Sequence, residues 1–282
     1  MKKVVVSIVV VFIGLVSFIS CGNGAASEKP NGELGYEILK KWELPGELRE
    51  ISGISWIGEN RIACVQDEDG IIFIYNLETS KIEKSVPFGK AGDYEGITVV
   101  GNNAYVLRSD GVIFEVTNFQ NNDVKVNVHQ TGMQGLKGVN IEGLCADTKN
   151  NRLLLAVKER KNVSDIKEVY AFDLAGKNTG QDPFFKVQLS DPVFKDVKGK
   201  ISNKFNPGEI AIHPQTGDIY ILDGTNPKLV ITGNDGSIKD MIMLLAEDFE
   251  NPEGLTFSPG GEIYISNEAE SGPANILKVS LN

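Results

Sequence analysis

Three glutamates occupy equivalent places in a recurring segment of this chain, and their carboxylates are its clearest opportunity for chemistry. Glu95, Glu142 and Glu253 each precede a glycine and a hydrophobic strand. Carboxylates that face one another repel, so they need a cation, shared protons or basic partners. Calcium accepts six to eight oxygen ligands in loose geometry, which suits a ring of acids. If the three side chains converge, the sequence predicts a calcium site.

Three more acidic side chains are candidate ligands of the same calcium site. Asp67, Glu159 and Glu268 stand at the ends of the strands that follow the recurring segment. Two alternatives remain open for the glutamates. Arg108 and Lys158, close to the same strand ends, would neutralise them through salt bridges. Otherwise the glutamates would accept backbone N–H bonds from a neighbouring repeat, and their role would be structural.

Catalytic side chains are harder to find in this sequence. His129 and His213 are its two histidines, and neither stands near a cysteine, so soft-metal sites are disfavoured. A Ser–His–acid arrangement needs a histidine beside its nucleophile, whereas these two stand at a strand end and in a turn. We therefore predict no catalytic residue.

The segment that carries the glutamates recurs five times. Each copy combines a Glu-Gly, Ser-Gly or Gly-Glu pair with a hydrophobic strand, and a second strand follows it. All-strand repeats of about 40 to 50 residues indicate a β-propeller. A propeller brings the start of every innermost strand to one central channel, so the three glutamates are expected to converge. The five copies are Ile51–Ser55, Tyr94–Thr98, Ile141–Cys145, Pro207–Ala211 and Pro252–Thr256.

The spacing of the copies predicts an all-β, five-bladed β-propeller, with six blades as the alternative. The pairs near residues 52, 95, 142, 208 and 253 are 43, 47, 66 and 45 residues apart. The longest interval fits one blade with an insertion, which we place in Gly176–Asn206. We expect the N-terminal strand Tyr36–Leu44 to complete the last blade and close the ring, so that no sheet edge stays open.

The first 20 residues are typical of a bacterial lipoprotein signal peptide. Lys2 and Lys3 precede the apolar run Val4–Phe18, and Cys21 follows it. Acyl chains such as palmitate on Cys21 would anchor the protein to a membrane. The match is imperfect, because Ile19 stands where a small residue is usual. An uncleaved signal anchor is the alternative, although the apolar run is short for a membrane-spanning helix.

The chain therefore divides into three predicted regions and is expected in the bacterial cell envelope. Residues 1–20 are the signal peptide, residues 21–32 a flexible tether, and residues 33–282 a single propeller domain. The formal net charge is −10 and the pI about 4.9, which argues against nucleic-acid binding. We expect a monomer whose membrane contact is the lipid anchor.

Taken together, the motifs resemble the SdiA-regulated domain proteins of bacterial envelopes. The resemblance extends over about residues 33–282 and depends on the order and spacing of the motifs. It implies a five-bladed propeller with a calcium ion in a shared site, and a distant similarity to NHL-repeat and gluconolactonase-like propellers. The motifs are Glu50–Ser55, Gln66–Gly70, Gly92–Ile97, Ile141–Leu144, Ala211–Gly217 and Pro252–Leu255.

Two functions from different classes remain. The first is a membrane-anchored lipoprotein whose calcium-binding propeller is a binding or scaffold module for an unknown small-molecule or protein ligand. The second is a calcium-dependent hydrolase, similar to a lactonase, esterase or phosphoesterase, with Glu159 or Asp67 as its base. The sequence favours the first, because no set of His, Asn and Asp residues reproduces a lactonase site. An open metal position beside an unpaired carboxylate would favour the second.

Overall fold

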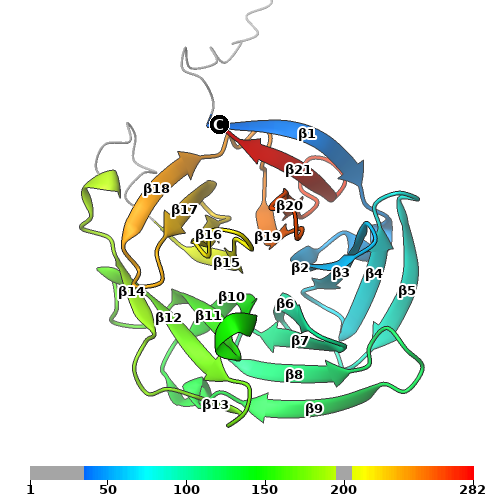
Figure 1. The fold of residues 1–282 in the computed structure, drawn as a ribbon, viewed down its shortest axis with the longest axis horizontal. Coiled ribbons are helices and arrows are strands. Elements are labelled where there is room, and N and C mark those ends of the chain that lie inside the picture. The colour runs from blue at the N-terminus through cyan, green and yellow to red at the C-terminus, as the bar shows by residue number, and fades with distance from the viewer. Residues whose placement is uncertain (1–34, 195–204) are drawn as a thin grey trace, which may run out of the picture. The chain divides into compact units, whose positions relative to one another are not determined.

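Hydrophobic segments rich in β-branched residues, separated by tight turns, favour strands along this chain. The computed structural model describes residues 35–194 and 205–282, and these belong to one compact unit. Within the described ranges the strands form five antiparallel sheets around a common centre (Figure 1). The predicted all-β, five-bladed β-propeller is confirmed, and the six-bladed alternative is wrong.

Each blade begins at its innermost strand and runs outward. Blade 1 contains β2 (Ile51–Gly58), β3 (Arg61–Gln66), β4 (Ile71–Asn76) and β5 (Lys81–Pro87). Blade 2 contains β6 (Tyr94–Val100), β7 (Asn103–Arg108), β8 (Val112–Thr117) and β9 (Lys125–Gln130). Blade 3 contains β10 (Asn140–Asp147), β11 (Arg152–Glu159), β12 (Ile166–Asp173), β13 (Asn178–Thr179) and β14 (Phe185–Gln188). Blade 4 contains β15 (Pro207–Ile212), β16 (Ile219–Asp223), β17 (Lys228–Thr232) and β18 (Ile238–Met243). Blade 5 contains β19 (Pro252–Phe257), β20 (Ile263–Asn267), β21 (Asn275–Leu281) and β1 (Tyr36–Glu43). The short 3₁₀ helices are η1 (Gly46–Leu48), η2 (Met133–Gly135), η3 (Thr148–Asn150) and η4 (Pro192–Phe194).

The outer edge of blade 3 accounts for much of the longest interval between repeats. In place of one fourth strand, the short strands β13 and β14 both pair with β12. Helix η4 follows them, and its Phe194 is buried. The predicted insertion Gly176–Asn206 spans these elements, although its residues 195–204 lie outside the described part of the chain.

Strand β1 closes the ring, as predicted. It pairs antiparallel with β21, so the N-terminal strand forms the outermost strand of the last blade (Figure 1). Trp42 on β1 donates a hydrogen bond from Nε1 to the Leu77 carbonyl at 2.7 Å, which links the closing strand to blade 1. The two ends of the propeller are therefore held by main-chain pairing and by a buried side chain.

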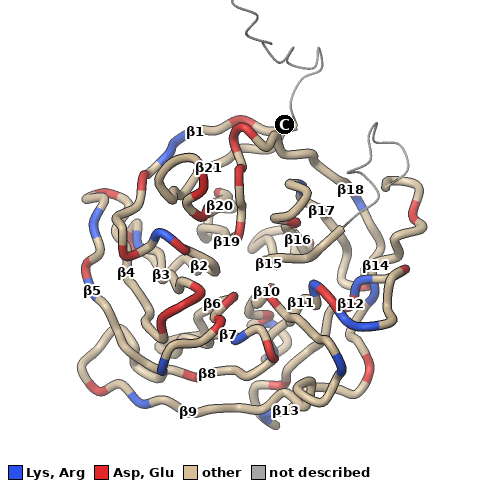
Figure 2. Tube along the Cα trace, turned by 180° about the vertical axis from the view of Figure 1, so that it is seen from behind, with Lys and Arg blue, Asp and Glu red and all other residues tan. Residues whose placement is uncertain are grey.

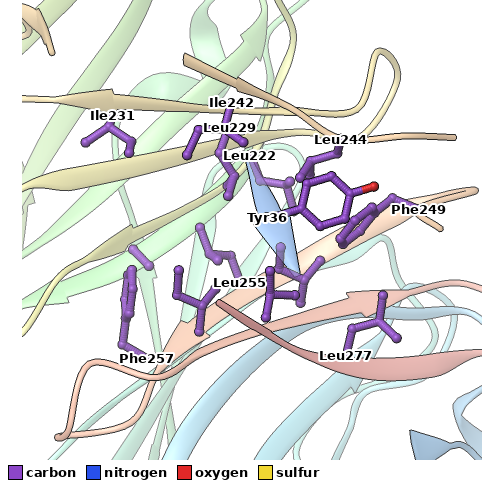
Figure 3. Close-up of a cluster of buried hydrophobic side chains, with 14 residues drawn as sticks. Tyr36, Leu222, Leu229, Ile231, Ile242, Leu244, Phe249, Leu255, Phe257 and Leu277 are labelled. Atoms are coloured by element: carbon purple, nitrogen blue, oxygen red, sulfur yellow. The ribbon is translucent and has the colours of Figure 1, made fainter. Parts of the chain in front are cut away.

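Hydrophobic side chains fill the space between neighbouring blades. Figure 3 shows the cluster between blades 4 and 5, which contains Leu222 from blade 4 and Leu255 and Leu277 from blade 5. Tyr36 of the closing strand packs edge-on against Phe249 in the same cluster, with ring centroids 5.2 Å apart. The closing strand thus contributes to the core as well as to the sheet.

Two further features concern cysteine and the membrane. Cys64 and Cys145 are buried and form no disulfide. The described residues include no helix with the length and apolar character needed to cross a membrane. The predicted signal peptide, the tether and Cys21 lie outside the described residues.

Candidate functional site

All five innermost strands are irregular at the same place, which is where the recurring pairs stand. The pairing of β6 with β7 passes over Glu95, that of β10 with β11 passes over Glu142, and that of β19 with β20 passes over Glu253. Ser52 in β2 and Gly208 in β15 are passed over in the same way. A bulge bends its strand and re-aims the residue that it leaves unpaired. The bulges therefore set the direction of the three glutamates.

The glycines of the recurring pairs lie against the inner strand of the neighbouring blade. A Cβ atom on Gly96 would lie 2.7 Å from Leu144 Cβ and 2.9 Å from the Glu142 carbonyl oxygen of the next inner strand. A Cβ atom on Gly53 would lie 2.6 Å from the Ile97 nitrogen. Carbon atoms do not approach so closely, so only glycine fits. The inner strands of neighbouring blades consequently pack close together.

The three glutamates affect one another's ionisation. Burial, followed by the charges of Glu142, Asp93 and Glu253, raises the pKa of Glu95 to about 9. Burial, followed by the charge of Glu142, raises the pKa of Glu253 to about 8. Neither Glu95 nor Glu253 makes a hydrogen bond or ion pair with the described residues. The channel thus holds two half-buried carboxyl groups that lack a partner among the described residues.

Lys158 forms an ion pair with the third glutamate, Glu142. Its Nζ lies 2.8 Å from Glu142 Oε2, and Asn140 donates a hydrogen bond to Glu142 Oε1 at 2.8 Å. Burial still raises the pKa of Glu142, because its desolvation outweighs the nearby lysine. Arg108 pairs with Asp110 instead, with 2.8 Å between Nη2 and Oδ2. Of the two basic residues suggested by the sequence, only Lys158 neutralises a channel glutamate.

A second group of acids adjoins the three glutamates. Burial, followed by a hydrogen bond shared with Glu50, raises the pKa of Glu268 to about 7. The pKa of Asp67 is also raised, by burial and then by Glu50, and its buried Oδ1 has no hydrogen-bond partner among the described residues. Glu268 and Asp67 both raise the pKa of Glu253, so the two groups lie within electrostatic range of each other. Figure 2 shows acidic segments beside β6 and on the chain that enters β19.

The remaining candidates lie elsewhere. Glu159 is exposed, and it acts electrostatically on Lys167 rather than on the channel glutamates. His129 Nε2 lies 2.9 Å from an oxygen of Glu115 on β8, in the outer half of blade 2. His213 accepts backbone N–H bonds in its own turn through Nδ1. The structure therefore groups Asp67 and Glu268 with the three glutamates and leaves Glu159 apart.

Sequence reasoning did not single out one buried acid of the channel, Glu209. Its pair is inverted to Gly208-Glu209, which places the carboxylate where other blades have glycine. The Leu144 and Ile210 backbone N–H groups donate to Glu209 Oε1 at 2.7 and 2.8 Å. Complete burial raises its pKa well above the usual value. Glu209 thus takes the structural role considered for the other glutamates, and the inverted order Gly-Glu was the signal.

The described residues contain no group of three His, Cys, Asp or Glu side chains already arranged to hold a metal ion. The donor chemistry nevertheless suits a hard cation, because Glu95, Glu253 and Asp67 carry carboxylate oxygens, and the buried Asp67 Oδ1 has no hydrogen-bond partner among the described residues. Binding would require these side chains to turn toward a common point. Glu142 is already engaged by Lys158, so it would have to share its carboxylate.

The family model of SdiA-regulated proteins matches residues 33–272 of this chain. The chain belongs to the SdiA-regulated family. A search of curated proteins found no match to this SdiA-regulated chain.

Solved structures share the fold of this SdiA-regulated propeller. Glutaminyl cyclase of Myxococcus xanthus is 15% identical, covers 88% of this chain and 96% of its own, and has a TM-score of 0.60. The PQQ-bound aldose sugar dehydrogenase of Streptomyces coelicolor is 12% identical, with coverages of 88% and 98% and a TM-score of 0.51. At such identities the likeness is one of fold, and function has to be argued from the site.

Proposed function

We propose that this protein is a lipid-anchored propeller of the bacterial cell envelope. It binds calcium among the channel glutamates, and the propeller face that carries these glutamates holds a small-molecule or protein ligand. The observation that carries the proposal is a charge imbalance. Glu95, Glu142 and Glu253 lie within electrostatic range of one another, and Lys158 is the one ammonium that pairs with them in the described residues.

The imbalance has a physical consequence. Burying ionised carboxylates without partners is costly, so the channel either takes up protons or recruits a cation. Asp67 and Glu268 increase the need for protons or a cation, because both raise the pKa of Glu253. A bound calcium ion would supply two positive charges and coordination sites that a ligand's oxygen atoms can complete. Lys158 would orient Glu142, whereas Glu95 and Glu253 are available to turn toward the ion.

The membrane anchor is a separate part of the proposal. Cys21 follows the signal-peptide pattern, and two or three acyl chains on it would give stable attachment. Labelling cells with an alkyne palmitate analogue should mark the wild-type protein and not the Cys21→Ser variant. Release of the unlabelled variant into the soluble fraction would support the anchor, whereas equal membrane retention would indicate an uncleaved signal anchor.

A calcium-dependent hydrolase is the second candidate, and one observation favours it. Asp67 has a buried, unpartnered Oδ1 beside the glutamates, which is what a base near a metal requires. Glu159, the other proposed base, lies apart from this group. Assays on lactones and phosphoesters, with calcium or a chelator, test the idea. Calcium-dependent turnover that Asp67→Asn removes would establish an enzyme.

The decisive experiment measures thermal unfolding of residues 21–282 carrying Cys21→Ser, with calcium or a chelator. At a calcium concentration roughly 100-fold above Kd, linkage predicts a midpoint rise of about 5–10 °C. Changing Glu95, Glu142 and Glu253 together to Gln should abolish the rise. The matched control changes the exposed Glu37, Glu47 and Glu78 to Gln. A wild-type protein that does not respond to calcium, or a triple variant that still does, would contradict the proposed site.

A further inference from the structure

The end of the channel opposite the glutamates forms a cavity of about 320 Å³. Each innermost strand has its bulge near its start, and the residues after the bulge line this cavity. All five blades therefore contribute to the lining. Volumes of this size are typical of small-molecule sites. The strand positions that correspond to one another around its wall are Ser55, Thr98, Cys145, Ala211 and Thr256.

The wall has a hydrogen-bonding side and an apolar side. Thr256, Ser55 and Thr98 come from the consecutive blades 5, 1 and 2, whereas Cys145 and Ala211 come from blades 3 and 4. At these matched positions a ligand would therefore meet three hydroxyl groups along one arc and small apolar side chains along the other, and the lining beyond them includes the hydroxyl residues Thr148 and Ser258.

The three hydroxyl groups have unused donors. Thr98 Oγ1 accepts the Ala146 backbone N–H at 3.0 Å, and Thr256 Oγ1 accepts the Trp56 backbone N–H at 3.0 Å. Each oxygen is thereby fixed in place while its own hydrogen stays available to donate. Ser55 is only 8% exposed, and its hydroxyl makes no hydrogen bond with any described residue. Since Ser55 lines the cavity, its hydroxyl can donate to a ligand or to water there.

No charged side chain of the described residues lines this cavity. Its rim includes Trp56, Phe257, Pro214 and Pro259, which offer flat apolar surfaces. A charged ligand would lose its hydration there without gaining a counter-charge. An apolar molecule would leave the Ser55 hydroxyl unsatisfied. The lining therefore selects against both classes.

We infer that this cavity binds a small uncharged molecule that carries a carbonyl oxygen. The oxygen accepts hydrogen bonds through its two lone pairs from Ser55 and from one of the neighbouring hydroxyls, Thr98 or Thr256, and the apolar body lies against Cys145 and Ala211. The inference goes beyond the calcium site, because it uses the opposite end of the channel and none of the glutamates. Binding should therefore be the same in calcium and in chelator.

The test uses acetophenone as the probe in a titration of backbone amide NMR shifts. Its matched analogues are benzoate, benzylamine and ethylbenzene, which are an anion, a cation and a hydrocarbon of similar size. Acetophenone should shift the amides of the lining residues and bind at least about tenfold more tightly than either charged analogue. Ethylbenzene should bind roughly fivefold more weakly than acetophenone, because it forms no hydrogen bond. Equal binding of all four, or no shift in the lining amides, would overturn the inference.

Two variants make the test specific to the cavity. Ser55→Ala removes a hydroxyl that supports no other group, and it should weaken acetophenone roughly fivefold. Ser85→Ala on the exposed face of β5 is the matched control and should change nothing. Ala211→Leu should fill the cavity and abolish binding, provided that its melting curve shows a folded protein. If it does not fold, Ser55→Ala decides alone, and wild-type affinity in that variant rejects the site.

Discussion

At the scale of single residues, Lys158 pairs with one channel glutamate, Glu142, and leaves Glu95 and Glu253 without a basic partner among the described residues. The pairing of β10 with β11 passes over both Glu142 and Lys158, so two bulged side chains meet at 2.8 Å. The side chain of Glu142 is only 5% exposed, and that of Lys158 is 25% exposed. A buried ion pair adds little net stability, but removal of one partner leaves a charge that the protein cannot solvate.

Lys158→Met should therefore be much more harmful than its surface control. We expect a loss of about 3 kcal/mol in the free energy of unfolding, measured by urea denaturation in chelator. The double variant Lys158→Met with Glu142→Gln should recover most of that loss, because the unpaired charge is gone. Lys81→Met on the exposed face of β5 is the control. If Lys158→Met proves as mild as Lys81→Met, the ion pair does not hold Glu142 in place.

Glu115 is another buried acid, and its neighbours lower its pKa instead of raising it. Burial alone would raise its pKa, but hydrogen bonds from His129, Tyr105 and Lys177 outweigh burial and lower the pKa to about 2. Tyr105 Oη donates to Glu115 Oε1 at 2.8 Å, and Lys177 Nζ lies 3.2 Å from Oε2. Lys177 comes from blade 3, so this cluster joins two blades.

The lowered pKa predicts a specific acid sensitivity. The ordinary pKa of a glutamate is 4.5, and the folded value is about 2, so the ionised form stabilises the protein fully above pH 4.5. That contribution, about 2 kcal/mol after allowance for partial exposure, is lost as the pH falls from 4.5 to 2. Thermal unfolding of Glu115→Gln across this range should show a shallower decline than wild type. Glu37→Gln should behave like wild type, and parallel curves for all three proteins would refute the assignment.

At the scale of elements, the Glu-Gly bulge is the unit that builds the channel. The bulge turns the glutamate away from the ladder, and the glycine lets the next inner strand approach. Neighbouring inner strands are also joined by side chains, since the Ser52 hydroxyl donates to the Tyr94 carbonyl at 2.7 Å. The site is thus a property of adjacent blades and not of any one blade.

Gly96→Ala tests this packing. Its Cβ would lie 2.7 Å from Leu144 Cβ and 2.9 Å from the Glu142 carbonyl oxygen, so a strand must move. We expect a loss of roughly 2 kcal/mol or more in unfolding free energy, measured by chemical denaturation. Gly46→Ala is the control, because nothing lies within 4 Å of its added Cβ. It should be neutral or slightly stabilising, and a comparable loss in both variants would show that crowding is not the cause.

At the scale of the whole propeller, stability depends on closing the ring. Strand β1 covers the edge of β21. Its residues Tyr36 and Trp42, and Leu44 directly after it, pack into two interblade clusters. An open edge presents unpaired N–H and C=O groups and templates association with other chains. The first and last strands of the described chain are therefore a single structural device.

Removal of β1 should both destabilise the protein and make it self-associate. A chain that starts at residue 45 loses three buried side chains and exposes β21, so we expect a loss of at least about 5 kcal/mol. Light scattering after size exclusion should detect dimers or larger species. A chain that starts at residue 33 retains β1 and should remain monomeric and stable. A shorter chain that stays monomeric with an unchanged melting point would contradict the closing role.

Much of this architecture was determined by local sequence pattern. The five copies of the Glu-Gly type segment, their spacing and the strands between them predicted five blades, and Tyr36–Leu44 was identified as the closing strand. Such features follow from short-range rules, because alternating hydrophobic residues and turn residues specify strands without reference to distant parts of the chain. The doubled outer edge of blade 3 was not predicted, because β13 and β14 are too short to show a pattern.

The chemistry of the channel was decided only by the tertiary structure. The sequence marked Glu95, Glu142 and Glu253 as equivalent, yet the fold gives Glu142 a lysine partner and leaves the other two unpaired. It also buries Glu209 completely, although the repeat alignment placed a glycine at the ligand position of that blade. The charge state of a carboxyl depends on burial and on neighbours from other blades. Bulges and the close packing of inner strands determine which residues become neighbours. That packing involves two blades, so no single repeat specifies it.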